Sequence, residues 1–317
     1  MDASFKEEQT ITTTEKLFVL GAPRSGTTFL SSLLRETRFG EPIESHFITK
    51  YGAKLAQYGD ISDFSNFRRL IRDVFAERPV QQWQLDFQPR EIFERMGPPR
   101  SYPALVDTLM LMREGREGKT AWGDKTPHYL GNVGQLVELF PDAQFIYIVR
   151  DGRDVALSLL EKPWGPANVI QCAEYWVRLN HPSSVIQRLE QQGQVFFLTY
   201  ESLLDFPEEM IRRLYRFLNE PLTEKDVRRL AAEAKSNSKF RWRRRMHARQ
   251  IRQFEAIAGP TLKRFGYDLA SQGAQVSPIE RMLSRLHGFY ARWRFLFKTN
   301  VIDGIKIRFF GKQPFNE

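Results

Sequence analysis

Three short apolar runs along the chain predict buried β-strands. They cover residues 17–20 (LFVL), 144–149 (QFIYIV) and 194–199 (QVFFLT). Apolar runs without alternation are typical of strands that are covered on both faces. Each run ends at a polar turn and precedes a segment with helical periodicity, at 27–35, 155–160 and 207–218. Strands that alternate with helices predict a three-layer α/β domain, with a central parallel sheet flanked by helices, over residues 16–270.

Three segments depart from this alternation. Residues 1–15 are polar and are expected to form a flexible N-terminus. Residues 51–118 are charged and aromatic, and they predict irregular helices that cover the core without forming a second one. In the extension 271–317, apolar residues recur at helical spacing from Pro278 on, while arginines line another face. Such a basic amphipathic helix can lie on an anionic membrane, here through 278–312, or pack on the domain or on a second subunit in a homodimer.

Composition narrows the possible partners and compartments. The 317 residues carry 47 Lys and Arg against 38 Asp and Glu, a net charge of +9, which favours an anionic partner. Cys172 is the single cysteine, so the chain can form no internal disulfide and no four-cysteine metal site. We find no apolar run long enough for a signal peptide or a membrane span. We therefore expect a soluble, cytoplasmic protein, with peripheral membrane contact as an option.

The first strand leads into a loop that resembles a phosphate-binding loop. Residues 21–28 read GAPRSGTT and connect the strand to a helix, so backbone N–H groups would favour an anion there. The nucleotide-binding pattern G-x-x-x-x-G-K-[ST] needs lysine where Thr27 stands, and Arg24 is the nearest substitute. We also find no acidic residue at a strand end that could hold Mg²⁺. An NTPase is therefore disfavoured, while a P-loop-like phosphate site remains; the alternative is a turn capped by Thr27 or Thr28.

The second strand leads into a turn that could hold another phosphate. Arg150 closes the strand, and Ser158 lies in the next helix on the same face as Asp154. Arginine binds phosphate oxygens in bidentate fashion, which suits a second anionic group. The alternative is that Arg150 pairs with Asp151 or Asp154 and that Ser158 has no special role.

Together the two motifs resemble the sulfotransferases that use 3′-phosphoadenosine-5′-phosphosulfate (PAPS), in particular their bacterial type. Residues 23–28 (PRSGTT) match the family's first loop, and Arg150 with Ser158 matches its second motif. Residues 44–47 (ESHF) and 123–127 (GDKTP) are similar to segments of the glycan-sulfating members. The resemblance continues in residues 200–203 (YESL) and in the closing run from Trp242-Arg243 through 265–267 (FGY), so it spans about residues 16–269.

The resemblance assigns roles to particular residues. It implies that the first loop holds the 5′-phosphosulfate and the second motif the 3′-phosphate, with Tyr200 near the nucleotide. The implied nucleotide-binding residues are Arg24, Ser25, Gly26, Thr27, Thr28, Arg150, Ser158 and Tyr200. Lys125 and Arg24 would neutralise charge near the transferred group. Glu44 is the expected base, and His46, two residues away, is a neighbouring acceptor-site or orienting residue that could also accept a proton. No metal is required.

The expected activity is sulfuryl transfer from PAPS to a hydroxyl of a carbohydrate or glycolipid, since the E-x-H-F segment is the glycan-like feature. A hydroxylated small molecule or lipid is the alternative acceptor, and residues 51–118 would shape its pocket. A P-loop kinase or a non-catalytic nucleotide-binding module is a more distant reading. The basic run 239–245 (KFRWRRR) is expected to close over the nucleotide. A solvated helix face ranks second for this run, and a nucleic-acid surface ranks last.

Overall fold

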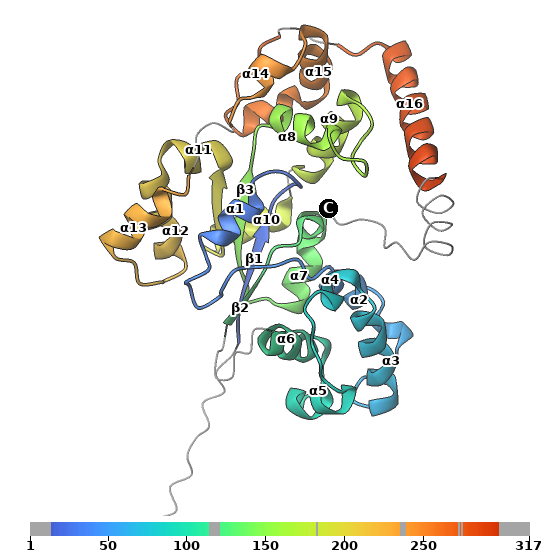
Figure 1. Ribbon diagram of the computed structural model, residues 1–317, viewed down its shortest axis with the longest axis vertical. Helices are drawn as coiled ribbons and strands as arrows, with labels where there is room; N and C mark the ends of the chain where they lie inside the picture. The colour runs from blue at the N-terminus through green and yellow to red at the C-terminus, as the bar shows by residue number, and fades with distance from the viewer. Residues whose placement is uncertain are drawn as a thin grey trace, which may run out of the picture.

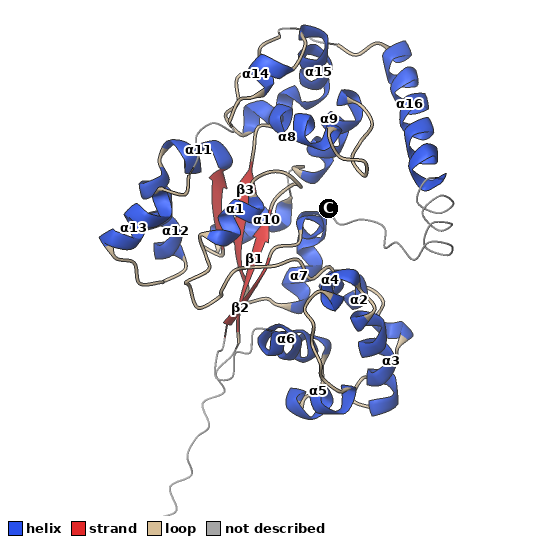
Figure 2. Cartoon of the chain, viewed as in Figure 1, coloured by secondary structure: helices blue, strands red, loops and turns tan. Residues whose placement is uncertain are grey.

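A parallel sheet of four strands forms the centre of the computed structural model, which describes residues 14–113, 121–181, 183–234, 239–271, 273 and 275–297. The strand order is β2-β1-β3-β4, and all neighbouring pairs are parallel. Figures 1 and 2 show these strands side by side, with helices on both faces. The strands are β1 Glu15–Leu20, β2 Ala121–Asp124, β3 Gln144–Val149 and β4 Val195–Thr199.

Alternation along the strands divides the core into two clusters, one on each face of the sheet. Leu17 and Val19 of β1 contribute to one cluster, whereas Phe18 and Leu20 contribute to the other. This follows from strand geometry, since successive side chains point to opposite faces. The two buried clusters make the domain three-layered, as the sequence predicts.

The smaller cluster lies beneath four helices that pack together on one face of the sheet. Tyr215 from this layer donates a hydrogen bond of 2.8 Å to the carbonyl of Leu33, which fixes the end of the first helix. The helices are α1 Thr27–Ser32, α11 Tyr200–Asp205, α12 Pro207–Phe217 and α13 Glu224–Ala231.

The larger cluster continues from the sheet into the helices of residues 47–113, so these helices share the main core, as expected. This segment holds α2 Phe47–Gly52, α3 Phe64–Phe75, α4 Arg78–Gln81, α5 Pro89–Met96 and α6 Tyr102–Arg113, with a 3₁₀ turn at Leu55–Gln57. The same face is covered by α7 Val133–Leu139, α8 Gly152–Leu160, α9 Val169–Leu179, α10 Ser184–Gln191, α14 Trp242–Arg245 and α15 Ala248–Arg264. A further 3₁₀ helix spans Pro127–Asn132, and α16 Pro278–Phe297 follows α15.

Strands β1, β3 and β4 confirm the three predicted strands, but β2 was not predicted. Its sequence, AWGD, is only four residues long, and its last two residues were noted only as the start of the GDKTP segment. Because β2 ends at Asp124, one acidic residue does stand at a strand end, although its side chain is buried. Most of the predicted flexible N-terminus, and residues 298–317 of the predicted extension, lie outside the described residues. Within the described part of the chain, no helix has the length and apolar character needed to cross a membrane.

Candidate active site

The residues singled out from the sequence lie at one edge of the sheet, where all four parallel strands end. The loop 21–26 follows β1, Lys125 follows β2, Arg150 follows β3 and Tyr200 follows β4. This edge is where open α/β sheets bind ligands. Sequence positions more than a hundred residues apart therefore contribute to a single site.

The loop after β1 has the backbone geometry of an anion cradle. Arg24 and Gly26 both have positive φ, of 72° and 93°, and the loop is closed by a 3.0 Å hydrogen bond from the Ser25 N–H to the Ala22 carbonyl. No side chain caps the N-terminus of α1. The buried Oγ of Ser25 has no hydrogen-bond partner among the described residues. An unpaired buried hydroxyl at the base of such a loop needs a partner, and a bound anion would supply one.

A hydrogen bond joins the first loop to the second motif. Arg24 Nε donates to Ser158 Oγ at 2.8 Å, although the two residues are 134 positions apart. Arg150 Nη1 also donates to the Arg24 carbonyl oxygen at 3.3 Å. The predicted pairing of Arg150 with Asp154 is present as well, at 3.6 Å. The two predicted phosphate motifs thus form one continuous site, and Ser158 faces Arg24.

Tyr200 closes this site from the side of β4. Its ring stacks on the Arg150 guanidinium, with 4.5 Å between the guanidinium carbon and the ring centroid. The same ring covers Gly26 so closely that a Cβ atom at that position would lie 2.6 Å from Tyr200 Cε2. Glycine is therefore required at position 26 for two reasons, the positive φ and the approach of the ring.

Glu44, His46 and Lys125 form a second cluster, beside β2. Ile43 forms a parallel bridge with Asp124, and the Lys125 N–H donates to the Ile43 carbonyl at 2.7 Å, which places Glu44 next to Lys125. Glu44 Oε1 accepts from Lys125 Nζ at 2.7 Å, and Glu44 Oε2 lies 2.9 Å from His46 Nε2. The predicted base and the predicted cation are thus in direct contact.

In and beside this second cluster, the pKa of an acidic residue depends on whether its side chain is exposed or buried. The hydrogen bond from His46 and the ammonium group of Lys125 lower the pKa of Glu44 to about 2, so its carboxylate is ionised at neutral pH. Burial instead raises the pKa of Asp124 to about 6. Burial also lowers the pKa of His128, whose ring centroid lies 5.8 Å from that of His46. The fixed negative charge facing the surface is therefore that of Glu44.

A buried ionic network behind Arg150 was missed in the sequence. Asp151 accepts hydrogen bonds from the Arg153 side chain at 2.8 and 2.9 Å and from Trp242 Nε1 at 2.9 Å. The Arg153 guanidinium carbon lies 3.7 Å from the centroid of the Trp242 ring, and Arg153 Nη1 donates to Glu255. The alternation of Arg and Asp in residues 150–154 was the available signal, but it was interpreted as a phosphate site or as ion pairs of Arg150, and Arg153 was not considered.

Glu201 connects the turn after β3 to the C-terminal part of the domain. Its Oε1 accepts from the Asp151 N–H at 3.1 Å, and its Oε2 accepts from the Tyr267 hydroxyl at 2.6 Å. Burial raises the pKa of Glu201. The YESL and FGY segments, noted separately in the sequence, are therefore two halves of one contact.

The basic run 239–245 is anchored at the same turn through its tryptophan. Trp242 is buried, and its backbone N–H donates to Asp154 Oδ1 at 2.8 Å, whereas Arg243, Arg244 and Arg245 are exposed. The middle of the run therefore lies against the turn that follows β3, whereas its first residue, Lys239, pairs with Asp205. Its closure over a nucleotide stays a prediction.

The chain matches the model of the sulfotransferase family over residues 16–224, about two thirds of its length. It belongs to the sulfotransferase family. The matched range of this family member contains every predicted site residue, from Arg24 to Tyr200. Among the described residues, no three His, Cys, Asp or Glu side chains are grouped so that they could hold a metal ion.

Curated relatives of this sulfotransferase family member include protein-tyrosine sulfotransferase 1 of Danio rerio, which is 27% identical over 216 residues. That alignment covers 65% of this chain and 53% of the relative. The protein-tyrosine sulfotransferase of Drosophila melanogaster is 26% identical over 216 residues, covering 65% of this chain and 38% of the relative. The chain thus spans about half or less of the length of these relatives. Among solved structures, the sulfotransferase domain of the Synechococcus PCC 7002 olefin synthase is 19% identical with a TM-score of 0.49, covering 81% of this chain and 96% of that one.

Proposed function

We propose that this protein is a sulfotransferase that uses PAPS as its donor and a hydroxyl group as its acceptor. The observation that carries the proposal is the hydrogen bond from Arg24 to Ser158. It unites two anion-binding motifs into one site at the edge of the sheet where the Glu44–Lys125 pair also lies. A donor with a 5′-phosphosulfate and a 3′-phosphate presents two anionic groups, one for each motif.

The residues present fit such a donor. The unpaired Ser25 hydroxyl, the N–H groups at the start of α1 and the Arg24 guanidinium would hold the 5′ group. Arg150 and Ser158 would hold the 3′-phosphate. Bound PAPS supplies an activated sulfuryl group, carried on a phosphate oxygen.

Within the chain, four side chains divide the chemical work. The Lys125 ammonium and the Arg24 guanidinium neutralise negative charge on the oxygens of the group being transferred. Glu44 takes the proton of the acceptor hydroxyl onto its carboxylate, which is ionised at neutral pH. His46 positions that carboxylate through the 2.9 Å hydrogen bond at Oε2. No covalent intermediate is needed, because positioning and charge neutralisation dominate this kind of transfer.

Two acceptor classes follow from different observations. Similarity to protein-tyrosine sulfotransferases supports the phenolic hydroxyl of tyrosine. The E-x-H-F segment supports the carbohydrate or glycolipid acceptor instead. We place the phenolic hydroxyl first.

Calorimetry without metal tests the donor site. Wild type is titrated with 3′-phosphoadenosine 5′-phosphate (PAP), 5′-AMP and ATP, beside Arg24→Ala, Arg150→Lys and the control Arg72→Ala, which removes an exposed arginine of α3. We expect tight binding only of PAP, weakened at least roughly tenfold by both site variants, since a charged hydrogen bond contributes about 1.5–3 kcal/mol. Preference for ATP, in this titration or in a parallel one with Mg²⁺ added, would favour the kinase instead.

Mass spectrometry of products formed from PAPS tests catalysis and acceptor class together. The acceptors are a tyrosine-containing peptide, a simple phenol, an oligosaccharide and a glycolipid. We expect sulfated phenols, and loss of turnover by roughly 10²–10⁴-fold in Glu44→Gln with PAP affinity retained. Sulfation of the sugars alone would reject the phenolic acceptor but keep the enzyme. PAP binding with no transfer to any acceptor would favour a non-catalytic nucleotide-binding module.

A further inference from the structure

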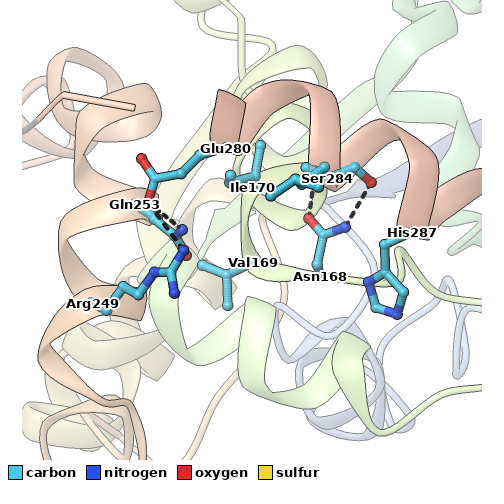
Figure 3. Close-up of a pocket in the computed structure, with 9 residues that line it drawn as sticks. Asn168, Val169, Ile170, Arg249, Gln253, Glu280, Ser284 and His287 are labelled. Carbon is cyan, nitrogen blue, oxygen red and sulfur yellow. Dashed lines mark hydrogen bonds and ion pairs between the residues drawn. The ribbon is translucent and has the colours of Figure 1, made fainter. Parts of the chain in front are cut away.

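Helix α16 attaches to the domain along one narrow face. Ser284 Oγ donates to Asn168 Oδ1 at 2.7 Å, and the Ser284 carbonyl accepts from Asn168 Nδ2 at 3.0 Å and from Gln171 at 3.1 Å. Figure 3 shows the Ser284–Asn168 contact beside a cavity of about 240 Å³. One turn further on, Gly288 approaches Gln171 so closely that a Cβ atom would overlap its amide. Small residues thus form this contact face.

A second attachment lies at the start of the helix and is ionic. Glu280 accepts hydrogen bonds from Arg252 at 2.7 Å and from Gln253 at 2.9 Å, both on α15. Glu280 is also the single acidic residue in α16. The negative charge of the helix therefore faces the domain and is already paired.

The opposite face of α16 is apolar and exposed. Helical geometry places its large apolar residues on one stripe, turned away from Ser284 and Gly288. Phe289 is 75% exposed and Trp293 is 55% exposed. The stripe consists of Ile279, Met282, Leu283, Leu286, Phe289, Tyr290, Trp293, Leu296 and Phe297. In Figure 1 this helix runs along the outside of the molecule, with one side away from the domain. A continuous exposed surface formed by nine large apolar side chains marks an interaction site.

Arginines border the stripe on both sides. Arg281, Arg285 and Arg292 fall along one edge and Arg294 along the other. None of the four forms an ion pair with another described residue, whereas Arg249 and Arg252 on the domain side pair with Glu280. The arginines of α16 that form no such ion pair therefore lie along the two edges of its apolar stripe.

From this arrangement we propose that α16 binds the surface of a phospholipid bilayer with anionic headgroups. The apolar stripe would enter the boundary between headgroups and acyl chains, while the flanking arginines contact lipid phosphates. A second copy of the chain is the less favourable occupant. In either two-fold pairing of two α16 stripes, an arginine edge of one helix meets an arginine edge of the other, and no carboxylate of α16 is left to neutralise it. The proposal does not depend on the sulfotransferase activity.

Vesicle flotation with the full chain tests this proposal. The probes are phosphatidylcholine vesicles with and without about one third phosphatidylglycerol. We expect flotation only with the anionic vesicles, and its loss in the double variant Phe289→Ser/Trp293→Ser. The variant Arg285→Gln/Arg292→Gln is expected to bind about thirtyfold more weakly, at about 1 kcal/mol for each arginine near the surface.

Control variants remove groups of the same kind from the helices that cover the other face of the sheet. Phe206→Ser deletes a phenylalanine that is 62% exposed between α11 and α12, and Arg213→Gln/Arg216→Gln removes two charges from α12. Both controls are expected to float like wild type. Flotation that all variants share, or no flotation at all, would overturn the proposal. Loss of a solution dimer in Phe289→Ser, without vesicle binding by wild type, would assign the stripe to a second copy.

Discussion

Gly26→Ala probes the contact on which the donor site depends. An alanine at φ 93° pays for the left-handed backbone, about 1–2 kcal/mol. Its Cβ atom would lie 2.6 Å from Tyr200 Cε2, so the ring must move away from Arg150, and overpacking of this kind costs about 1–3 kcal/mol. We therefore expect a loss of about 2–5 kcal/mol in the free energy of unfolding, together with weaker PAP binding.

Urea denaturation of a double-mutant cycle separates these two contributions. In the Tyr200→Ala background the ring is absent, so Gly26→Ala should cost only the backbone part. The coupling energy between the two substitutions is then about 1–3 kcal/mol. Gly131→Ala serves as the control, because a Cβ atom there meets nothing within 4 Å. Additive effects, within about 0.5 kcal/mol, would refute the argument that Tyr200 and Gly26 compete for the same space.

Three further substitutions test individual contacts. Trp242→Phe keeps a ring on Arg153 but leaves Asp151 without its indole donor, so we expect chemical denaturation to show a loss of about 1–3 kcal/mol; an unchanged midpoint would contradict this. Ser158→Ala removes the acceptor of Arg24 and is expected to weaken PAP binding by about 1 kcal/mol in calorimetry, with equal affinity as the contrary result. Burial raises the pKa of Asp124 to about 6, above about 3.9 in the unfolded chain, so wild type loses stability as the pH rises through this interval, whereas Asp124→Asn does not. The unfolding free energy of wild type should fall relative to that of Asp124→Asn by up to about 3 kcal/mol from about pH 4 to about pH 6, and parallel pH profiles would argue against it.

The sequence predicted those parts of the fold whose signal is local. Strands β1, β3 and β4 are apolar runs bounded by polar turns, and each was recognised for that reason. Strand β2 was missed because AWGD is short and ends in an aspartate, which becomes buried only when β2 pairs with β1. Its burial depends on a partner about a hundred residues away, and no local pattern reports that.

In the candidate site too, the local motifs could be predicted, whereas the contacts between them could not. The two phosphate motifs were recognised from their residues, but the hydrogen bond between Arg24 and Ser158 arises only from the alignment of strand ends. The contact of Glu44 with Lys125 likewise depends on the bridge at Ile43. The contribution of Trp242 to the buried network could not be predicted, because the arginines around it indicate a charged surface, whereas its ring is buried.

The buried network behind Arg150 determines where the C-terminal boundary of this domain can be placed in a chimeric protein. The family match ends at residue 224, yet partners of Asp151 and Arg153 come from Trp242 and Glu255. Glu255 is in turn held by the backbone N–H of Ser271 at 2.7 Å. Excision at residue 224 would leave charges buried without their partners, at a cost of about 3–5 kcal/mol for a broken pair. The smallest unit that can be transplanted with this network intact therefore reaches Ser271, and the junction to a foreign sequence belongs between that residue and α16.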